Sequence, residues 1–289
     1  MIEDPPAAPR TGKPREAQGW SNAVLFHPAA RRLAGWLAET PVTPNMVSVF
    51  GAAMVVAAGM LYALVGTTAA ILAGFAIHLA WHVVDGADGD LARLTGRASP
   101  LGEVVDGLCD YGGHVVLYVL LAVSLMPLLG WGAWALAVAA GASRIVQSVY
   151  AESQRRTYLW WAYGVPWLRT GATPRAGGLP GLYLRASELL TAGTGEVEPF
   201  AADGDPRLPP LARVEGRRTL PLQVLLGANV RTVLLGLAML AGSPAWFFLV
   251  EASVLNLLLV VSILGQRQAS TRIVTRLAGT ASGTAGSFR

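Results

Sequence analysis

The chain has 289 residues, of which 53% are hydrophobic and 14% are charged. Soluble domains carry about 25% charged residues, so this composition excludes an ordinary soluble protein and indicates a polytopic membrane protein. The net charge of +4 does not favour nucleic-acid binding, and the single cysteine, Cys109, excludes an intramolecular disulfide.

The N-terminal region changes character near residue 20. Residues 1–18 are polar and rich in proline, whereas in residues 20–39 Leu33, Trp36 and Leu37 alternate at helical spacing with Arg31 and Arg32. This pattern predicts a cytoplasmic leader followed by an amphipathic helix in the membrane interface, with its arginines toward lipid phosphates. The alternative is a helix packed on the protein's own cytoplasmic face.

Six apolar stretches follow, at about 45–65, 69–90, 101–125, 134–161, 221–240 and 245–265. Each is long enough to cross a bilayer, which takes ~20 residues. A polar loop rich in Gly and Pro covers about 164–219, with a short apolar piece at 182–191. We therefore predict an all-α membrane protein in three parts: 1–41 with the interfacial helix, 42–266 with six transmembrane helices, and a cytoplasmic tail at 267–289.

The basic residues set the orientation of these spans. The short turns at 66–69, 126–131 and 241–244 contain no Lys or Arg, whereas the turns and termini on the other side contain many. The positive-inside rule places that second side, with both termini, in the cytoplasm. We expect the bacterial inner (plasma) membrane as the location.

One motif stands out, between positions 85 and 110. Its residues fall on two helical stripes: Asp85, Asp88, Gly89 and Ala92 on the first, and Gly102, Asp106 and Asp110 on the second. A turn at 96–100 is expected to fold the second helix back against the first. Four carboxylates would then face one another on the cytoplasmic side, with small residues leaving room for a ligand.

Carboxylates this close together either take up protons or need cations. An all-oxygen ligand set suits hard ions such as Mg²⁺, Mn²⁺ or Ca²⁺ rather than zinc. Two divalent ions would neutralise four carboxylates and could bridge the oxygens of a diphosphate. Arg93 adds a fixed positive charge for a phosphate. The alternative is a solvated acidic loop between two spans.

These residues resemble the signature of the CDP-alcohol phosphotransferases. The eight matching positions are Asp85, Asp88, Gly89, Ala92, Arg93, Gly102, Asp106 and Asp110. The resemblance implies that Asp85, Asp88 and Asp106 hold two Mg²⁺ or Mn²⁺ ions, and that Asp110 deprotonates the acceptor hydroxyl and also contributes to the metal site. It also implies that Gly89, Ala92, Arg93 and Gly102 contact the cytidine nucleotide, and that the enzyme is a homodimer.

Other polar residues near the motif have less specific patterns. His114 lies one turn after Asp110, where it could orient that carboxylate, although a satisfied buried histidine is the alternative. Arg144 and Arg231 lie in the cytoplasmic halves of the fourth and fifth spans. In relatives that use a phosphorylated alcohol, basic residues in the later spans bind the acceptor's phosphate, and these two are candidates. Glu251 lies away from the motif and is expected to pair within the bundle.

The predicted reaction transfers a phosphatidyl or other phosphoalcohol group from a CDP-alcohol, with CDP-diacylglycerol favoured, to an acceptor hydroxyl and releases CMP. The partners are this substrate and the lipid bilayer. An intramembrane prenyltransferase is one alternative, but it needs a second aspartate-rich motif, and the sequence has none outside 85–110. A divalent-cation transporter is another, but its acids would be spread across the bilayer midplane.

Overall fold

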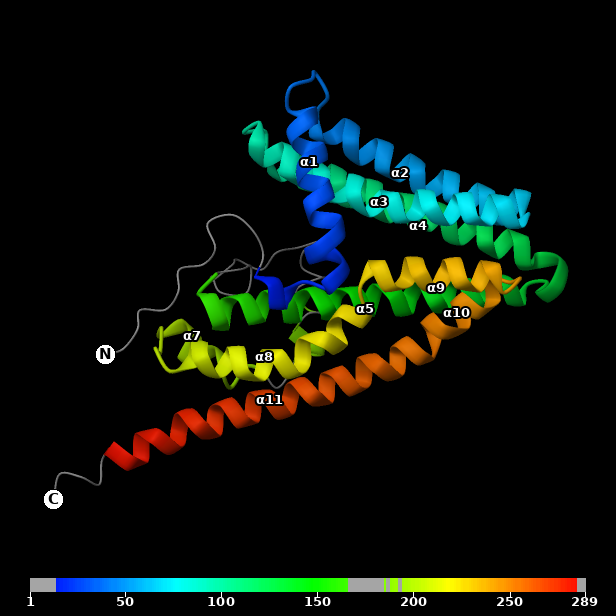
Figure 1. Ribbon diagram of the computed structural model, residues 1–289. Coiled ribbons are helices and arrows are strands. Elements are labelled where there is room, and N and C mark those ends of the chain that lie inside the picture. Colours follow the sequence, from blue (N-terminus) through cyan, green and yellow to red (C-terminus); the bar gives the residue numbers. More distant parts are fainter. Residues whose placement is uncertain (1–13, 166–184, 186–187, 192–193, 285–289) are drawn as a thin grey trace. The chain divides into compact units, whose positions relative to one another are not determined.

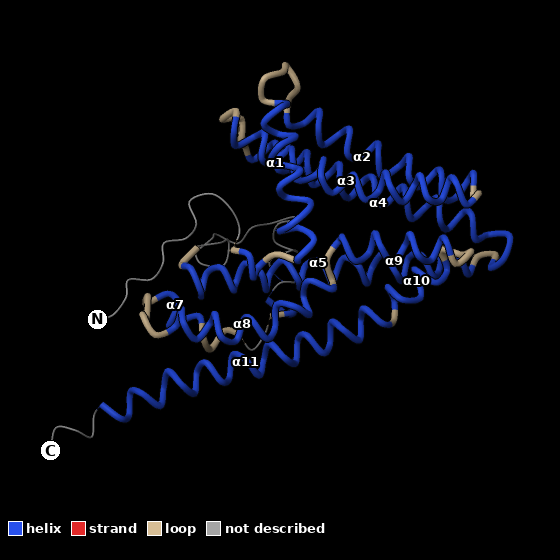
Figure 2. Tube along the Cα trace, viewed as in Figure 1, coloured by secondary structure: helices blue, strands red, loops and turns tan. Residues whose placement is uncertain are grey.

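The structure is a computed structural model that describes residues 14–165, 185, 188–191 and 194–284. Within these residues the ordered elements are helices, and no strand is present. Figure 2 shows the same elements along the chain trace. The chain divides into two compact units. We name Trp20–Arg144 with Ala228–Val254 the aspartate unit, and Met1–Gly19 with Ile145–Gly227 and Leu255–Arg289 the second unit.

The aspartate unit contains most of the apolar helices. Its elements are η2 (Asn22–Phe26), α1 (His27–Leu37), α2 (Pro44–Met60), η3 (Leu61–Val65), α3 (Thr68–Leu94), α4 (Pro100–Leu129), α9 (Ala228–Leu240), α10 (Ala245–Ala252) and the first part of α5 (Gly132–Tyr163). In Figure 1, α3 and α4 run alongside α2, and all three belong to this unit.

The starts of three long helices follow from capping residues in the sequence. Thr43, Thr67 and Ser99 each precede a helix, and each side-chain oxygen accepts a hydrogen bond from a backbone N–H in the first turn, at 3.0 to 3.3 Å. Such caps satisfy donors that have no partner inside the helix. Pro44 and Pro100 occupy the first position of their helices, where a missing N–H costs nothing. The caps therefore fix where α2, α3 and α4 begin.

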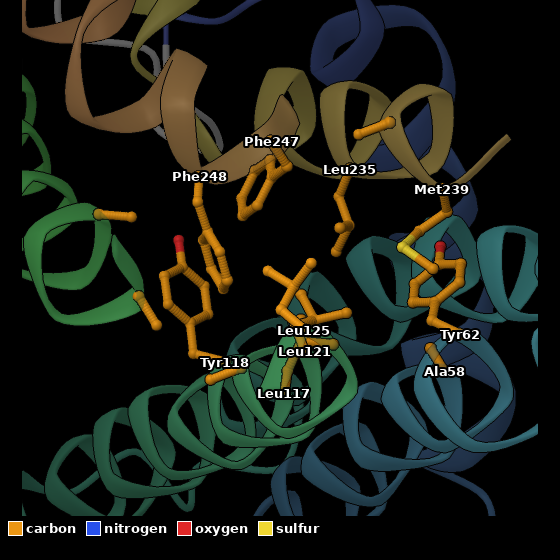
Figure 3. Close-up of a cluster of buried hydrophobic side chains, with 14 of the residues drawn as sticks. Ala58, Tyr62, Leu117, Tyr118, Leu121, Leu125, Leu235, Met239, Phe247 and Phe248 are labelled. Carbon is orange, nitrogen blue, oxygen red and sulfur yellow. The ribbon is translucent and has the colours of Figure 1, made fainter. Parts of the chain in front are cut away.

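The core of the aspartate unit is aromatic and aliphatic. Figure 3 shows Tyr118, Phe247, Phe248, Leu121 and Leu125 in one cluster that joins α4 to α10. Small residues allow the helices to approach closely: a Cβ added at Gly236 of α9 would lie 2.5 Å from the Phe75 ring of α3. Close contacts at small residues are typical of helices that associate in a bilayer.

The second unit is built from the more polar parts of the helices. It contains η1 (Arg15–Ala17), the end of α5, α7 (Glu198–Ala202), α8 (Leu208–Leu225) and α11 (Val254–Thr284), whose first residue lies at the unit boundary. Its core includes Tyr158, Trp161 and Ile273. Glu215 of α8 is buried and lies 3.1 Å from Arg272 of α11 and 3.3 Å from Arg218. The pair with Arg272 joins α8 to α11, and the pair with Arg218 lies within α8.

Five stretches are long and apolar enough to cross a membrane: Pro44–Val65, Thr68–Leu94, Leu101–Leu129, Leu208–Leu240 and Ala245–Gly279. The chain is thus an integral membrane protein, and an all-α fold is confirmed for the described residues. The predicted count of six spans is not. The predicted fourth span forms as α5, but Arg144, Glu152, Arg155 and Arg156 make that helix less apolar than the other spans.

Two helix boundaries differ from the prediction. Residues 164–219 were expected to be mostly irregular, yet α8 begins at Leu208, because Pro209 and Pro210 suit the first turn of a helix and the residues after them are good helix formers. The sequence after Ala278 is rich in Gly, Thr, Ser and Ala, which favours disorder, yet α11 continues to Thr284. The apolar piece predicted at 182–191 lies largely outside the described residues.

A helix is present where the interfacial helix was predicted. Ala30 and Ala34 of α1 are buried against Ala87 and Leu91 of α3 and Val47 of α2. Its arginines, Arg31 and Arg32, are exposed. This contact fits the alternative of packing on the protein itself. Whether α1 also lies in the bilayer interface stays a prediction.

Candidate active site

The two acid-bearing helices meet at a short turn. α3 ends in a glycine-capped motif: Gly96 has a φ of +65°, and the N–H of Arg97 donates to the Ala92 carbonyl at 2.9 Å. A left-handed glycine after the last helical residues is a common way to end a helix. Ser99 then caps α4 through the N–H of Gly102 at 3.0 Å. The turn leaves Asp85 and Asp88 near the end of α3, and Asp106 and Asp110 near the start of α4.

Helix α2 is the common partner of both acid-bearing helices. Among the described helices, α3 and α4 each pack closely along α2, and they meet each other through side chains, such as Trp81 and His114, rather than along their backbones. Small residues explain this packing. A Cβ added at Gly51 would lie 3.4 Å from Trp81 of α3, and one added at Gly113 would lie 3.3 Å from Ala52. The scaffold of the site therefore includes a third helix.

Asp88 and Asp106 lie together at the centre of the site. Asp88 is 5% exposed, and its Oδ2 accepts a hydrogen bond from Ser48 Oγ of α2 at 2.7 Å. Its Oδ1 accepts from the N–H of Gly89 at 2.5 Å. The Asp106 carboxyl is within hydrogen-bonding reach of Asp88 and interacts electrostatically with Asp110. Two carboxyls in such contact need either a shared proton or a cation between them.

Asp110 has a buried oxygen, Oδ1, that lies beside His114 but accepts no hydrogen bond from a described residue. Nδ1 of His114 hydrogen bonds to the Asp110 backbone carbonyl at 2.8 Å and lies 3.1 Å from Oδ1. Oδ1 is buried and accepts no hydrogen bond from any described residue, and its contact with the His114 ring is longer than that of the carbonyl. The His114 ring is held by Trp81, with the ring centroids 4.8 Å apart. A buried carboxylate oxygen left free to accept is suited to a substrate hydroxyl or to a cation.

The remaining motif residues surround these carboxyls along the two helices. Asp85 is half-buried on α3, one turn before Asp88. Arg93 is exposed and pairs with Asp90 at 2.6 Å. Gly89 and Gly102 lack side chains that would fill this space: a Cβ at Gly89 would lie 3.5 Å from Arg93, and one at Gly102 would lie 3.2 Å from Ser99 Oγ. Ala92 lies half-buried on α3.

The donor set fits a hard divalent ion in its chemistry. Carboxylates and the Ser48 hydroxyl are oxygen donors, and the Asp88–Asp106 contact is one that a cation would relieve. As they stand, the described residues contain no group of three Asp, Glu, His or Cys side chains spaced to hold an ion. The assignment of metal to Asp85, Asp88, Asp106 and Asp110 is therefore a proposal that rests on the donor chemistry and on the carboxyl contact.

A comparison with protein families decides the identity of this region. Residues 41–166 match the model of the CDP-alcohol phosphatidyltransferase family. They form a CDP-alcohol phosphatidyltransferase domain. The resemblance drawn from the eight motif positions is thereby confirmed. No curated protein matches the chain.

The matched segment of the CDP-alcohol phosphatidyltransferase domain runs from just before α2 to just after α5, and it contains all four aspartates. Enzymes of this family transfer phosphoalcohol groups from CDP-alcohols, are membrane embedded and generally use divalent metals. Helices α1, α8, α9, α10 and α11 lie outside the segment. The domain match therefore covers the acids but not every helix that packs around them.

Arg231, from outside the domain, is already paired. Its Nε lies 2.6 Å from Glu251 Oε1, and the two side chains are 3% and 0% exposed. Glu251 thus pairs within the bundle, as predicted. Arg144 lies over the Tyr118 ring, 5.8 Å from its centroid, and interacts electrostatically with Asp110. A role for Arg144 and Arg231 in binding an acceptor phosphate stays a prediction, and for Arg231 it would require opening the pair with Glu251.

Sequence reasoning missed two residues that contact the site. Ser48 bonds directly to Asp88 although the two are 40 positions apart, and a lone serine in an apolar span carries no local signal of such a role. Tyr118 lies two turns after Asp110 and connects Arg144 to Glu251. Its position on the stripe that continues from Asp106 and Asp110 is a signal that could have identified it.

Proposed function

We propose that this chain transfers a phosphatidyl or other phosphoalcohol group from a CDP-alcohol to an acceptor hydroxyl and releases CMP. CDP-diacylglycerol is the donor we favour. The observation that carries this proposal is the interaction of Asp106 with both Asp88 and Asp110, together with a buried Asp110 oxygen that accepts no hydrogen bond from the described residues. The domain match supports the transferase class.

Asp85, Asp88 and Asp106, with a contribution from Asp110, would hold two Mg²⁺ or Mn²⁺ ions. When bound, these ions polarise the diphosphate and neutralise charge on the departing CMP. Ser48 fixes the Asp88 carboxylate, because its hydroxyl donates to Oδ2. Gly89, Ala92 and Gly102 keep space for the nucleotide, and Arg93 places a positive charge near its phosphates once it leaves Asp90.

Asp110 acts as the general base in this scheme. Its free Oδ1 accepts the proton of the acceptor hydroxyl as the hydroxyl oxygen attacks the β-phosphorus. The bond from that phosphorus to the CMP oxygen breaks, and CMP leaves with its electron pair. His114 holds the backbone of Asp110 through its Nδ1, which fixes the direction of the carboxylate.

The orientation and assembly are part of the same proposal. The positive-inside distribution supports a site and two termini on the cytoplasmic side, where soluble nucleotides are made. A homodimer is proposed from the family resemblance alone.

The test is CMP release by the purified protein in lipid nanodiscs, measured with a panel of CDP-alcohols and acceptor alcohols. The proposal expects metal-dependent release of CMP from at least one donor, with a matching phosphoester product. Release of pyrophosphate from prenyl donors, or ion uptake into vesicles without CMP release, would reject it in favour of the other classes.

A further inference from the structure

Glu251 of α10 is the centre of a polar chain inside the aspartate unit. Its Oε1 is 2.6 Å from Arg231 Nε, and its Oε2 accepts from the Tyr118 hydroxyl at 2.7 Å. Arg144 in turn lies over the Tyr118 ring, 5.8 Å from its centroid. The chain thus runs from Arg231 through Glu251 and Tyr118 to Arg144, and it crosses four helices.

The far end of this chain reaches the candidate active site. Arg144 interacts electrostatically with both Asp110 and His114. In Figure 3 the Tyr118 ring stands beside Phe248, and its hydroxyl points toward the helix that carries Phe247 and Phe248. The Tyr118 side chain thus makes two contacts at once: its ring faces the Arg144 guanidinium, and its hydroxyl donates to Glu251.

Stability alone does not account for this arrangement. A buried ion pair is often no more stabilising than apolar residues of similar volume, because both charges lose their hydration. The Glu251 and Arg231 side chains are 0% and 3% exposed, so that loss is complete here. What the polar chain provides is a fixed position: an arginine side chain has many rotamers, and it loses side-chain entropy when it is held in one of them. Tyr118 and Glu251 supply the contacts that hold Arg144.

We propose that Glu251 is a positioning residue for the transfer reaction. Through Tyr118 it holds the Arg144 guanidinium near Asp110. The positive charge of Arg144 then keeps the Asp110 carboxylate in one orientation. This inference rests on the proposed function of Asp110. It adds α10, a helix outside the family-matched segment, to the machinery of the site.

Tyr118→Phe tests the link with the smallest change. It removes one oxygen and keeps the ring in the core. Misplacement of a catalytic group by about 1 Å costs on the order of 100-fold in rate, so we expect kcat to fall by about 10- to 100-fold. KM for the CDP-alcohol should stay within about twofold, because nucleotide contacts lie elsewhere. Tyr62→Phe is the matched control: Tyr62 lies in the same core cluster, and its hydroxyl has no partner among the described residues.

A second comparison separates positioning from structural support. The double variant Arg231→Met, Glu251→Met removes both charges at similar volume. We expect the Tm of this variant in nanodiscs to stay near the wild-type value. Its kcat should remain at least about 10-fold low, because Tyr118 and Arg144 have lost their anchor. Recovery of kcat together with Tm, or wild-type kcat in Tyr118→Phe, would overturn the inference. Absence of CMP release by the wild-type protein would instead reject the proposed function.

Discussion

In the aspartate unit, Glu251 and Asp88 are buried charged groups with hydrogen-bond partners, whereas in the second unit several buried uncharged groups have none among the described residues. Glu251 binds Arg231 and Tyr118, and Asp88 accepts from Ser48. In the second unit, Gln154 Oε1, Trp161 Nε1 and Gln223 Oε1 are buried without a hydrogen-bond partner among the described residues.

The surroundings of these unmatched atoms differ between the units. In the second unit, Gln154, Trp161 and Gln223 line one cavity of about 10 Å³, which is room for one water molecule. We expect one water in this cavity to donate to both glutamine oxygens and to accept from the indole N–H. In the aspartate unit, the free Asp110 oxygen lies beside Asp88 and Asp106, which are themselves charged groups. A buried polar atom without a hydrogen-bond partner therefore indicates a substrate or metal site only where charged groups lie around it.

Metal removal gives the largest expected effect, and it acts on the aspartate unit, which carries the proposed metal site. Exhaustive treatment with EDTA should reduce CMP release to background, and Mg²⁺ or Mn²⁺ should restore it, because an all-oxygen site offers no soft ligand. Turnover is measured before and after metal is added back, with Zn²⁺ as the comparison ion. Full turnover in chelated protein would remove the metal from the proposed function.

Asp106→Asn should separate activity from stability. Loss of a metal ligand should lower turnover by more than the ~10- to 100-fold typical of an outer-shell partner. In metal-free protein the Tm should be equal or higher, because the new amide can donate to Asp88 where two carboxyls met before. Turnover and thermal unfolding are measured on the same preparation.

Glu103→Gln is the control for Asp106→Asn, since it removes an acid near Asp106 that carries no assigned role. It should leave turnover unchanged. Wild-type turnover in Asp106→Asn, or a marked loss of Tm without metal, would contradict the assignment.

Asp110→Asn should lower single-turnover CMP release by about 10²–10⁴-fold, the usual contribution of a general base. Asparagine keeps the size of the side chain and one oxygen, but it does not accept a proton near neutral pH. Affinity for the CDP-alcohol, measured by calorimetry, should change only a few-fold. An equally steep fall in affinity would make Asp110 chiefly a metal ligand, and no fall in either would make it a bystander.

The smallest expected effect concerns the cavity of the second unit. Gln154→Leu and Gln223→Leu should each lower the free energy of unfolding by about 1 kcal/mol. The double variant should cost little more than either single one, because both oxygens depend on the same water. Gln147→Leu is the control: Gln147 donates to Asn256 at 2.8 Å, so its effect should add to that of Gln154→Leu. Full additivity of the first pair would exclude a shared water.

The local parts of this architecture were predictable, and the distant contacts were not. The spacing of Asp85, Asp88, Asp106 and Asp110 placed the acids near the ends of two successive helices, because helical periodicity is local information. The contact of Ser48 with Asp88 joins residues 40 positions apart, and that of Tyr118 with Glu251 joins residues 133 apart. No periodic pattern encodes such pairs.

The prediction of helix boundaries was wrong where the composition fits both a loop and a helix. Residues 208–225 contain three prolines and four charged side chains, which is typical of a loop, yet they form α8. Two of the prolines stand in its first turn, where they are tolerated, and the buried Glu215 is paired with Arg218 and Arg272. A charged residue that is paired in the fold is indistinguishable in the sequence from one that is solvated.

The distance along the sequence between Tyr118 and Glu251 also sets the order in which contacts form while the protein is synthesised. Chains are made from the N-terminus and their parts fold as they emerge, so α3 and α4 deliver all four aspartates before α9 and α10 have been synthesised. Until α10 inserts, the Tyr118 hydroxyl lacks its acceptor 133 positions away. A nascent chain that has reached residue 166 holds the complete acid motif but not Glu251. The ribosome thus completes the acidic motif well before it supplies Glu251.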